Sequence, residues 1–237
     1  MALLPLELEG IGLDADGRTL LDGISLTIGS PGKTVILGPN GAGKSLLLRL
    51  CHGLIAPTRG TITWTETDRL NQRRAQGMVF QKPVMLRRSV KANVAYGLAL
   101  HRVPRERQVQ RIEAALAITG LAELADRYAP SLSMGEQQRL ALARAHALEP
   151  EVLFLDEPTA SLDPGATGQV EDLIGRIGDS GTKIIMTTHD LSQARRIADE
   201  IIFLHDGHLV EKADGKRFFA SPGTETGRAF LEGRLLW

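Results

Sequence analysis

The sequence has few of the features that mark several large protein classes. It has one cysteine in 237 residues, Cys51, so no disulfide can form within the chain. Lysine plus arginine equals aspartate plus glutamate at 28 each, which leaves no overall charge to attract nucleic acid or an anionic membrane. No apolar run approaches the roughly 20 residues that span a bilayer. We therefore expect neither a nucleic-acid partner nor a membrane-spanning segment.

The composition is that of an ordinary globular protein. A hydrophobic content of 43% in a chain of this length is enough for a substantial core. The start, Met1–Glu7, is interrupted by Pro5 and has no basic leader, so we do not expect a signal peptide. A single thiol is compatible with a reducing compartment, and Cys51 is expected to be a small core residue rather than a reactive one.

The most specific pattern is Gly38-Pro39-Asn40-Gly41-Ala42-Gly43-Lys44-Ser45, which fits G-x-x-x-x-G-K-[ST]. The β-branched run Lys33–Leu37 before it predicts a buried strand, and Leu46–Leu50 after it predicts the first turns of a helix. Strand, glycine loop and helix are the context that a phosphate site requires. Glycines let backbone N–H groups approach phosphates, and the helix adds its positive end. Lys44 would reach the β- and γ-phosphates, and the Ser45 hydroxyl would bind Mg²⁺.

Two carboxylates end an apolar run at Glu151–Glu157. A buried strand that delivers acids at its C-terminal end presents them to a bound ligand in an α/β sheet. Asp156 would then lie in the outer shell of Mg²⁺, and Glu157 would polarise the attacking water. Solvated acids are also common at strand ends, so this pattern gains its meaning only beside the phosphate loop.

A serine and an acid open a strongly helical stretch at Leu132–Ala145. Ser133 followed three residues later by Glu136 predicts a capping box. Free N–H groups at such a helix end also bind anions, so the structural and the functional interpretation are compatible.

Taken together, these motifs resemble the ATP-binding subunit of an ABC transporter, in that family's order and over nearly the whole chain. The further matches are Phe80-Gln81 for the Q-loop, Leu132–Gln137 for the signature motif, Ser161-Leu162-Asp163 for the D-loop and Thr188-His189-Asp190 for the switch histidine. The resemblance implies ATP and Mg²⁺ as cofactors. The implied catalytic residues are Lys44, Gln81, Glu157 and His189; the implied nucleotide-binding residues are Gly38, Pro39, Asn40, Gly41, Ala42, Gly43, Lys44, Ser45, Ser133, Gly135, Glu136 and Asp163; and the implied metal ligands are Ser45, Gln81 and Asp156.

The chain departs from the family pattern at two positions. Met134 stands where the first signature glycine is usual, which puts tight packing there in doubt. Ala15 stands where an aromatic ring usually stacks on adenine, so nucleotide affinity is expected to be weaker unless Arg18 stacks instead. Arg18 is also interpretable as a surface turn residue.

The order of patterns predicts an α/β fold. We expect one ABC ATPase domain of the P-loop NTPase class over residues 1–237. Its nucleotide-binding core, about 1–81 and 148–237, would combine a parallel sheet with a small antiparallel β subdomain, and about 82–147 would form an inserted α-helical subdomain with the signature. The expected helices are 90–100, 105–118, 135–147 and 169–177, and the expected later strands are 152–155, 183–187 and 200–204.

The resemblance also implies partners and place. Two copies would pair head to tail with ATP between them, on the cytoplasmic face of a membrane, against integral permease subunits and with a periplasmic or extracellular solute-binding protein in the same system. The segments Val84–Val90 and Phe230–Trp237 look most like ATPases of tungstate importers, with phosphate and molybdate systems close behind. The alternatives are an exporter ATPase or a weakly hydrolysing regulatory cassette.

A basic cluster, Lys82, Arg87, Arg88 and Lys91, follows the Q-loop. It is interpretable as a docking face for a cytoplasmic helix of the permease or as a solvated surface.

Overall fold

The computed structural model describes residues 3–29 and 31–234. It divides into two compact units, residues 1–72 with 183–237 and residues 73–182. Two segments used in the sequence analysis lie partly outside the described residues. They are Met1–Glu7, at Met1 and Ala2, and Phe230–Trp237, at its last three residues. Within the part of the chain that the structure describes, none of the helices combines the length and apolar character needed to cross a bilayer.

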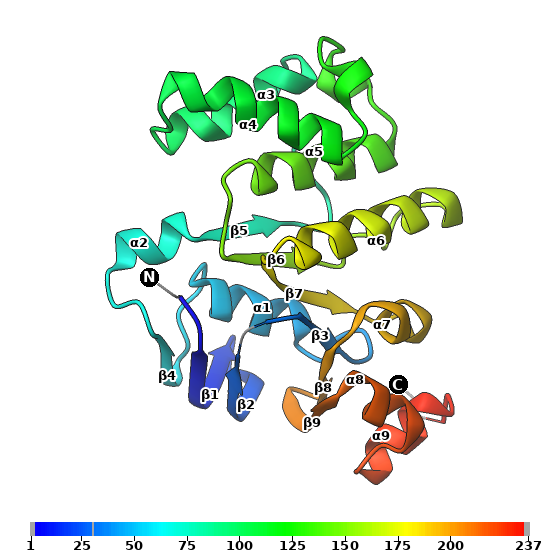
Figure 1. Cartoon of the computed structure of the whole chain (residues 1–237). Coiled ribbons are helices and arrows are strands. Elements are labelled where there is room, and N and C mark those ends of the chain that lie inside the picture. The colour runs from blue at the N-terminus through cyan, green and yellow to red at the C-terminus, as the bar shows by residue number, and fades with distance from the viewer. Residues whose placement is uncertain (1–2, 30, 235–237) are drawn as a thin grey trace. The chain divides into compact units, whose positions relative to one another are not determined.

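An antiparallel sheet opens the first unit, as expected (Figure 1). It consists of β1 (Leu6–Ala15), β2 (Arg18–Ile28) and β4 (Arg59–Trp64) in the order β2-β1-β4. Alternate residues of β1, such as Leu6 and Leu8, are buried, because side chains of a strand point to opposite faces. The β1–β2 turn uses Asp16 and Gly17 with φ of 50° and 72°, the left-handed pair that a tight hairpin needs.

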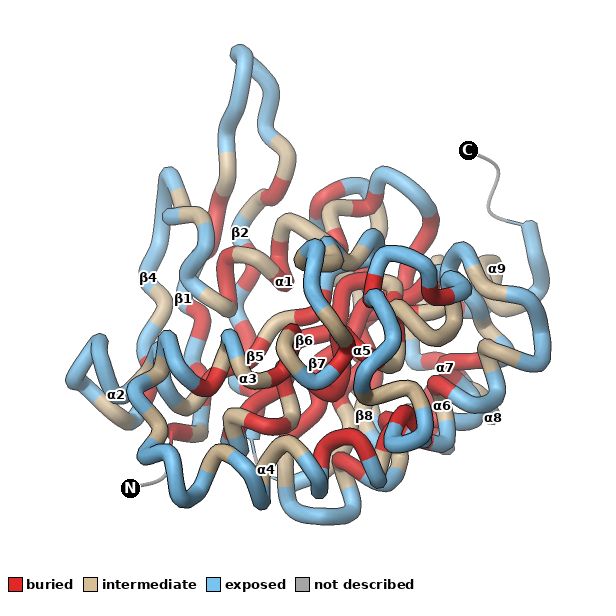
Figure 2. The backbone as a smooth tube through the Cα atoms, turned by 90° about the horizontal axis from the view of Figure 1, so that it is seen from above, coloured by how far each residue is buried: buried red, intermediate tan, exposed pale blue. Residues whose placement is uncertain are grey.

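A second set of strands, parallel except for the last, forms the core of the first unit. It contains β3 (Lys33–Leu37), β7 (Lys183–Thr188), β8 (Glu200–His205) and β9 (His208–Asp214) in the order β7-β3-β8-β9. The strands β7, β3 and β8 are parallel, which confirms the expectation, and Figure 2 shows β7 as buried backbone. The antiparallel strand β9 was not expected; the turn at Asp206 and Gly207, both left-handed, reverses the chain.

Five helices accompany these strands. They are α1 (Lys44–His52), α2 (Arg69–Arg74) at the border between the units, α7 (Leu191–Ile197), α8 (Gly215–Ala220) and α9 (Glu225–Leu231). Aromatic rings attach the last two helices to β8: the ring centroids of Phe203 and Phe218 are 5.6 Å apart, and those of Phe203 and Phe230 are 4.9 Å apart. This packing buries Phe203 and Phe218 fully.

The second unit contains two parallel strands and most of the long helices. They are β5 (Gln76–Val79), α3 (Val90–Leu100), α4 (Arg105–Ile118), the short turns η1 (Ala122–Leu124) and η2 (Ala129–Ser131), α5 (Met134–His146), β6 (Val152–Asp156) and α6 (Pro164–Asp179). The observed α6 is longer than the predicted 169–177, because Asp163 caps it and Pro164 suits its first position.

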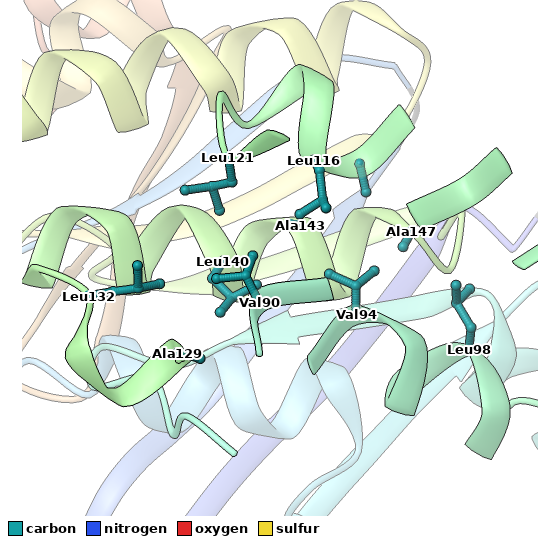
Figure 3. Packing of buried hydrophobic residues seen from close by; sticks show 11 residues of the cluster. Val90, Val94, Leu98, Leu116, Leu121, Ala129, Leu132, Leu140, Ala143 and Ala147 are labelled. Atoms are coloured by element: carbon teal, nitrogen blue, oxygen red, sulfur yellow. The ribbon is translucent and has the colours of Figure 1, made fainter. Parts of the chain in front are cut away.

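The helices α3, α4 and α5 enclose a core of their own (Figure 3). It consists of Val90, Val94, Leu98, Ala115, Leu116, Leu121, Ala129, Leu132, Leu140, Ala143 and Ala147. The buried Asn93 closes the preceding loop, since its amide accepts from Leu86 N at 3.0 Å and donates to Leu86 O at 3.2 Å. The expected helical subdomain of residues 82–147 lies within this unit, which also holds β5, β6 and α6. The predicted limits of the helical subdomain, about residues 82 and 147, stay a prediction.

Candidate nucleotide site

The glycine loop follows β3, whose last four residues are fully or almost fully buried. Gly38 leaves the strand where β8 passes close by, so that a Cβ at Gly38 would lie 2.2 Å from Leu204 O. Gly43 caps α1 with φ of 92°, a left-handed conformation, and without a side-chain cap. The backbone N–H groups at the start of α1 therefore have no side-chain acceptor at that cap, which leaves the helix end suited to an anion.

Lys44 lies inside the loop that precedes it. Its side chain is 5% exposed, and its ammonium donates to Pro39 O at 2.9 Å. Ala42 N donates to the same carbonyl at 3.3 Å, so the loop is closed by its own backbone. A buried ammonium needs such partners. The arrangement holds the positive charge of Lys44 beside the loop's N–H groups.

His189 leaves the same edge of the parallel core as the glycine loop. The pairing of β3 with β7 places Leu37 opposite Thr188. Gly38 and His189 are the next residues of the chain, so each directly follows the end of one of two neighbouring parallel strands. Asp190 then caps α7, because its carboxylate accepts from Ser192 N at 2.7 Å and Gln193 N at 3.0 Å. His189 is exposed at this position.

A corresponding edge in the second unit carries Gln81, Asp156 and Glu157. The strands β5 and β6 are parallel, with Val79 opposite Leu155. Gln81 and the two acids therefore lie at or just after the C-terminal ends of these neighbouring strands. Asp156 is 3% exposed, whereas Gln81 is exposed and Glu157 is half-buried. Glu157 has φ of 44°, a left-handed conformation that side chains other than glycine rarely adopt. No sequence pattern indicates this conformation, and strain of this kind gathers at functional sites.

The start of α5 is the predicted capping box. The Ser133 hydroxyl accepts from Glu136 N at 3.3 Å, and the Glu136 carboxylate accepts from Ser133 N at 2.7 Å. The hydrogen bond from the Ser133 backbone is the main cause that lowers the pKa of Glu136. Ser133 itself remains exposed.

The first turns of α5 and α6 lie against each other. A Cβ at Gly135 would come within 2.8 Å of the Ala166 Cβ, so the glycine allows the close approach. Asp163 caps α6 by accepting from Ala166 N at 3.0 Å. The structure thereby brings Ser133, Gly135 and Asp163 to one region of the second unit.

The two departures from the family pattern lie at the surface. Met134 is 48% exposed. Ala15 and Arg18 flank the β1–β2 turn and are also exposed. Neither position fills the core, so both substitutions leave the fold intact.

The expectation for Cys51 is confirmed. The residue is 1% exposed on α1, and burial raises the pKa of its thiol to about 12. A thiol with this pKa is almost entirely protonated near neutral pH and is a poor nucleophile.

Among residues 3–29 and 31–234, no group of three or more histidine, cysteine, aspartate or glutamate side chains could hold a metal ion. The predicted ligands Ser45, Gln81 and Asp156 offer a hydroxyl, an amide oxygen and one carboxylate. This oxygen donor set fits Mg²⁺, which keeps several waters and is commonly shared between one or two carboxylates and substrate phosphates.

Comparison with known proteins agrees with this geometry. The profile of the ABC transporter family matches residues 21–160. The phosphate import ATP-binding protein PstB 2 of Natronomonas pharaonis is 39% identical over 249 residues, covering 98% of this chain and 88% of the relative. The tungstate uptake system ATP-binding protein TupC of Peptoclostridium acidaminophilum is 42% identical over 200 residues, covering 84% of this chain and 93% of the relative.

Solved structures show the same fold. CbiO1 from Clostridium perfringens, part of the ABC transporter complex cbiONQ, superposes with a TM-score of 0.84 at 31% identity and covers 93% of this chain and 92% of its own. The α/β architecture with an antiparallel β subdomain is thus that of the ABC ATPases. Motifs, fold and relatives agree: the chain belongs to the ABC transporter family and is an ATP-binding ATPase subunit.

Proposed function

We propose that this chain hydrolyses MgATP, as a head-to-tail pair of identical copies, to energise the import of an inorganic oxyanion through a membrane permease. The observation that carries the ATPase part is the closed glycine loop, with Lys44 buried on Pro39 O at 2.9 Å. The proposal for the cargo comes from the phosphate and tungstate import relatives, at 39% and 42% identity.

The residues of the first unit would hold the nucleotide. Residues 38–45 would surround the β- and γ-phosphates with N–H groups, and Lys44 would neutralise their charge. Gly38 lets the loop leave β3 beside β8, because a Cβ there would lie 2.2 Å from Leu204 O. His189, on the neighbouring parallel strand, would contact the γ-phosphate.

The residues of the second unit would supply the reacting water. We propose that Glu157 accepts a proton from water while the water oxygen bonds to the γ-phosphorus, and that the bond from this phosphorus to the β–γ bridging oxygen breaks. ADP and phosphate are the products. Ser45, Gln81 and Asp156 would hold Mg²⁺, which when bound neutralises charge on the phosphate oxygens.

The partner copy would complete each site. Ser133, Gly135 and Glu136 begin α5 with a satisfied cap and an exposed end, and Asp163 begins α6 beside them. An exposed helix start of this kind can approach a phosphate on another molecule. Met134, 48% exposed at this end, would then lie in the interface between the copies.

A surface near the basic cluster would dock the permease at the cytoplasmic face of the membrane. Phe80 and Val84 are 45% and 75% exposed, and Arg88 lies over the Tyr96 ring at 5.4 Å from its centroid. Exposed apolar side chains rimmed by cations are typical of a protein interface. A solute-binding protein would deliver the oxyanion to the permease, since importers of this type work with one.

The test is Glu157→Gln. This variant should bind MgATP and pair in its presence but hydrolyse it about 100-fold or more slowly, because it loses the proton acceptor. Phosphate release measures turnover, and light scattering with and without MgATP measures pairing. Glu113→Gln, an exposed carboxylate on α4, is the control and should hydrolyse normally. Normal hydrolysis by Glu157→Gln would show that another residue is the base.

A further inference from the structure

A cavity of about 390 Å³ lies between α4 and the end of α5, within the second unit. Its volume is at the small end of the range for ligand sites in proteins. Ala115 and Ala147 form its apolar side, and both belong to the buried cluster of the helices, in which Ala147 is labelled (Figure 3). The cavity is separate from every residue assigned to ATP above.

The polar side of the cavity is basic. Arg107 and Arg111 both line it and lie one helical turn apart on α4, so their side chains share a face. Arg111 forms an ion pair with Glu149, the single carboxylate of the lining. In the described part of the chain, Arg107 is exposed and no carboxylate pairs with it. The lining therefore carries one positive charge in excess with His146 neutral.

Glu149 is held in an unfavourable backbone conformation. It follows the end of α5 with φ of 54°, and its N–H donates to His146 O at 2.8 Å. A left-handed residue at a helix end is usually glycine, because a Cβ is strained in that conformation. The carboxylate of this glutamate pairs with the Arg111 guanidinium and neutralises it at the cavity wall.

His146 also lines the cavity. Its Nδ1 is buried without a hydrogen-bond partner in the structure. Because this atom has almost no accessible surface, a molecule in the cavity would not reach it, and the polar contacts available there are those of the arginines. Burial also lowers the pKa of His146, although Glu149 opposes this.

We propose that this cavity binds a small organic phosphate, with the phosphate group between Arg107 and Arg111 and the organic part on Ala115 and Ala147. Guanidinium groups match phosphate oxygens in geometry, and a phosphate can accept hydrogen bonds from two of them at once. The cavity is larger than inorganic phosphate needs, and its apolar side offers no hydrogen bonds to a hydrated ion. These two points favour a phosphate ester over the free ion.

The experiment is a calorimetric titration of the full chain in a Lys44→Ala background, because the glycine loop also takes phosphates. The probes are glucose 6-phosphate, glucose and inorganic phosphate. We expect glucose 6-phosphate to bind with Kd of about 1 mM or less, and both other probes to bind about tenfold or more weakly. No nucleotide is present, so the outcome is independent of the proposed ATP hydrolysis.

Three variants locate the site. Arg107→Gln should weaken binding about tenfold or more, since the phosphate loses a charge-assisted hydrogen bond. Arg105→Gln, on the same helix but outside the lining, should bind as before. Glu149→Gly should fold well at its left-handed position and bind more tightly, because it removes the negative charge that competes with the phosphate for Arg111.

Three results would overturn the proposal. One is the absence of glucose 6-phosphate binding at about 1 mM both in the background protein and in Glu149→Gly. A second is binding that Arg107→Gln leaves unchanged. Equal affinity for inorganic phosphate would likewise contradict the assignment to an organic phosphate.

Discussion

At the scale of single residues, the candidate site depends on backbone positions as much as on reactive side chains. Gly38 is required by a carbonyl of β8, because a Cβ at Gly38 would lie 2.2 Å from Leu204 O. Glu157 keeps a left-handed φ of 44° although it is not a glycine. One position therefore tolerates no side chain, and the other holds a side chain against its backbone preference.

Gly38→Ala should lose nucleotide binding and about 1–3 kcal/mol of unfolding free energy, because the new methyl group must displace backbone rather than a flexible side chain. Urea unfolding and fluorescent ATP titration measure the two effects. Gly168→Ala is the matched control: this glycine lies on α6 with nothing within 4 Å of the added Cβ. It should stabilise the protein by up to about 1 kcal/mol. If both variants behave alike, the contact with Leu204 does not constrain the loop.

At the scale of elements, the motifs coincide with helix starts. Side-chain caps begin α3, α5, α6 and α7, at Ser89, Ser133, Asp163 and Asp190. A capped start fixes where the first free N–H groups lie. Two of these caps, Ser133 and Asp163, are also proposed nucleotide contacts, so the same residues define the helix starts and belong to the proposed site.

The capping box of α5 should make stability depend on pH. Hydrogen bonds from Ser133 lower the pKa of Glu136 in the folded protein. Its stabilisation is therefore complete above the unfolded pKa of about 4.3 and is lost as the pH falls through the lower folded pKa. Glu136→Gln, which keeps the cap's hydrogen bond, should lose less stability than the wild type between about pH 5 and pH 3. Urea unfolding at each pH measures this.

Glu113→Gln is the control for this measurement, since Glu113 is an exposed carboxylate of α4. Its stability should fall with acid as in the wild type. An unchanged acid dependence in Glu136→Gln would mean that the capping carboxylate does not contribute.

At the scale of the whole molecule, the chain combines zero net charge with a local basic surface. The chain has no net charge, yet Lys82, Arg87 and Arg88 stand beside the exposed Phe80 and Val84. Lys91 differs from its neighbours because it pairs with Asp126 at 2.5 Å. The basic surface proposed for docking therefore rests mainly on the two arginines.

The double variant Arg87→Glu with Arg88→Glu should keep ATP hydrolysis in the isolated chain but lower transport in vesicles with the permease about tenfold or more. Like charges placed across an interface cost several kcal/mol. Arg73→Glu with Arg74→Glu, two exposed arginines of α2, is the matched control and should transport normally. Equal transport by both double variants would assign the cluster to solvated surface.

The sequence was sufficient for the elements that short-range patterns specify. The predicted β3, α3 and α4 agree with the structure at both ends, and α5 differs by one residue at each end. These segments combine clear periodicity with a capping or breaking residue. The strand β9 and the helices α8 and α9 were missed, because their residues gain order mainly by packing on β8.

By itself, the sequence determined the family, the glycine loop and the capping box, because each depends on residues close together in the chain. Only the tertiary structure decided that Gly38 meets Leu204 O, that Glu157 is left-handed and that α4 and α5 leave a basic cavity. These features depend on contacts between segments far apart in the sequence. Spacing along the chain does not encode such contacts; the packing of the folded protein does.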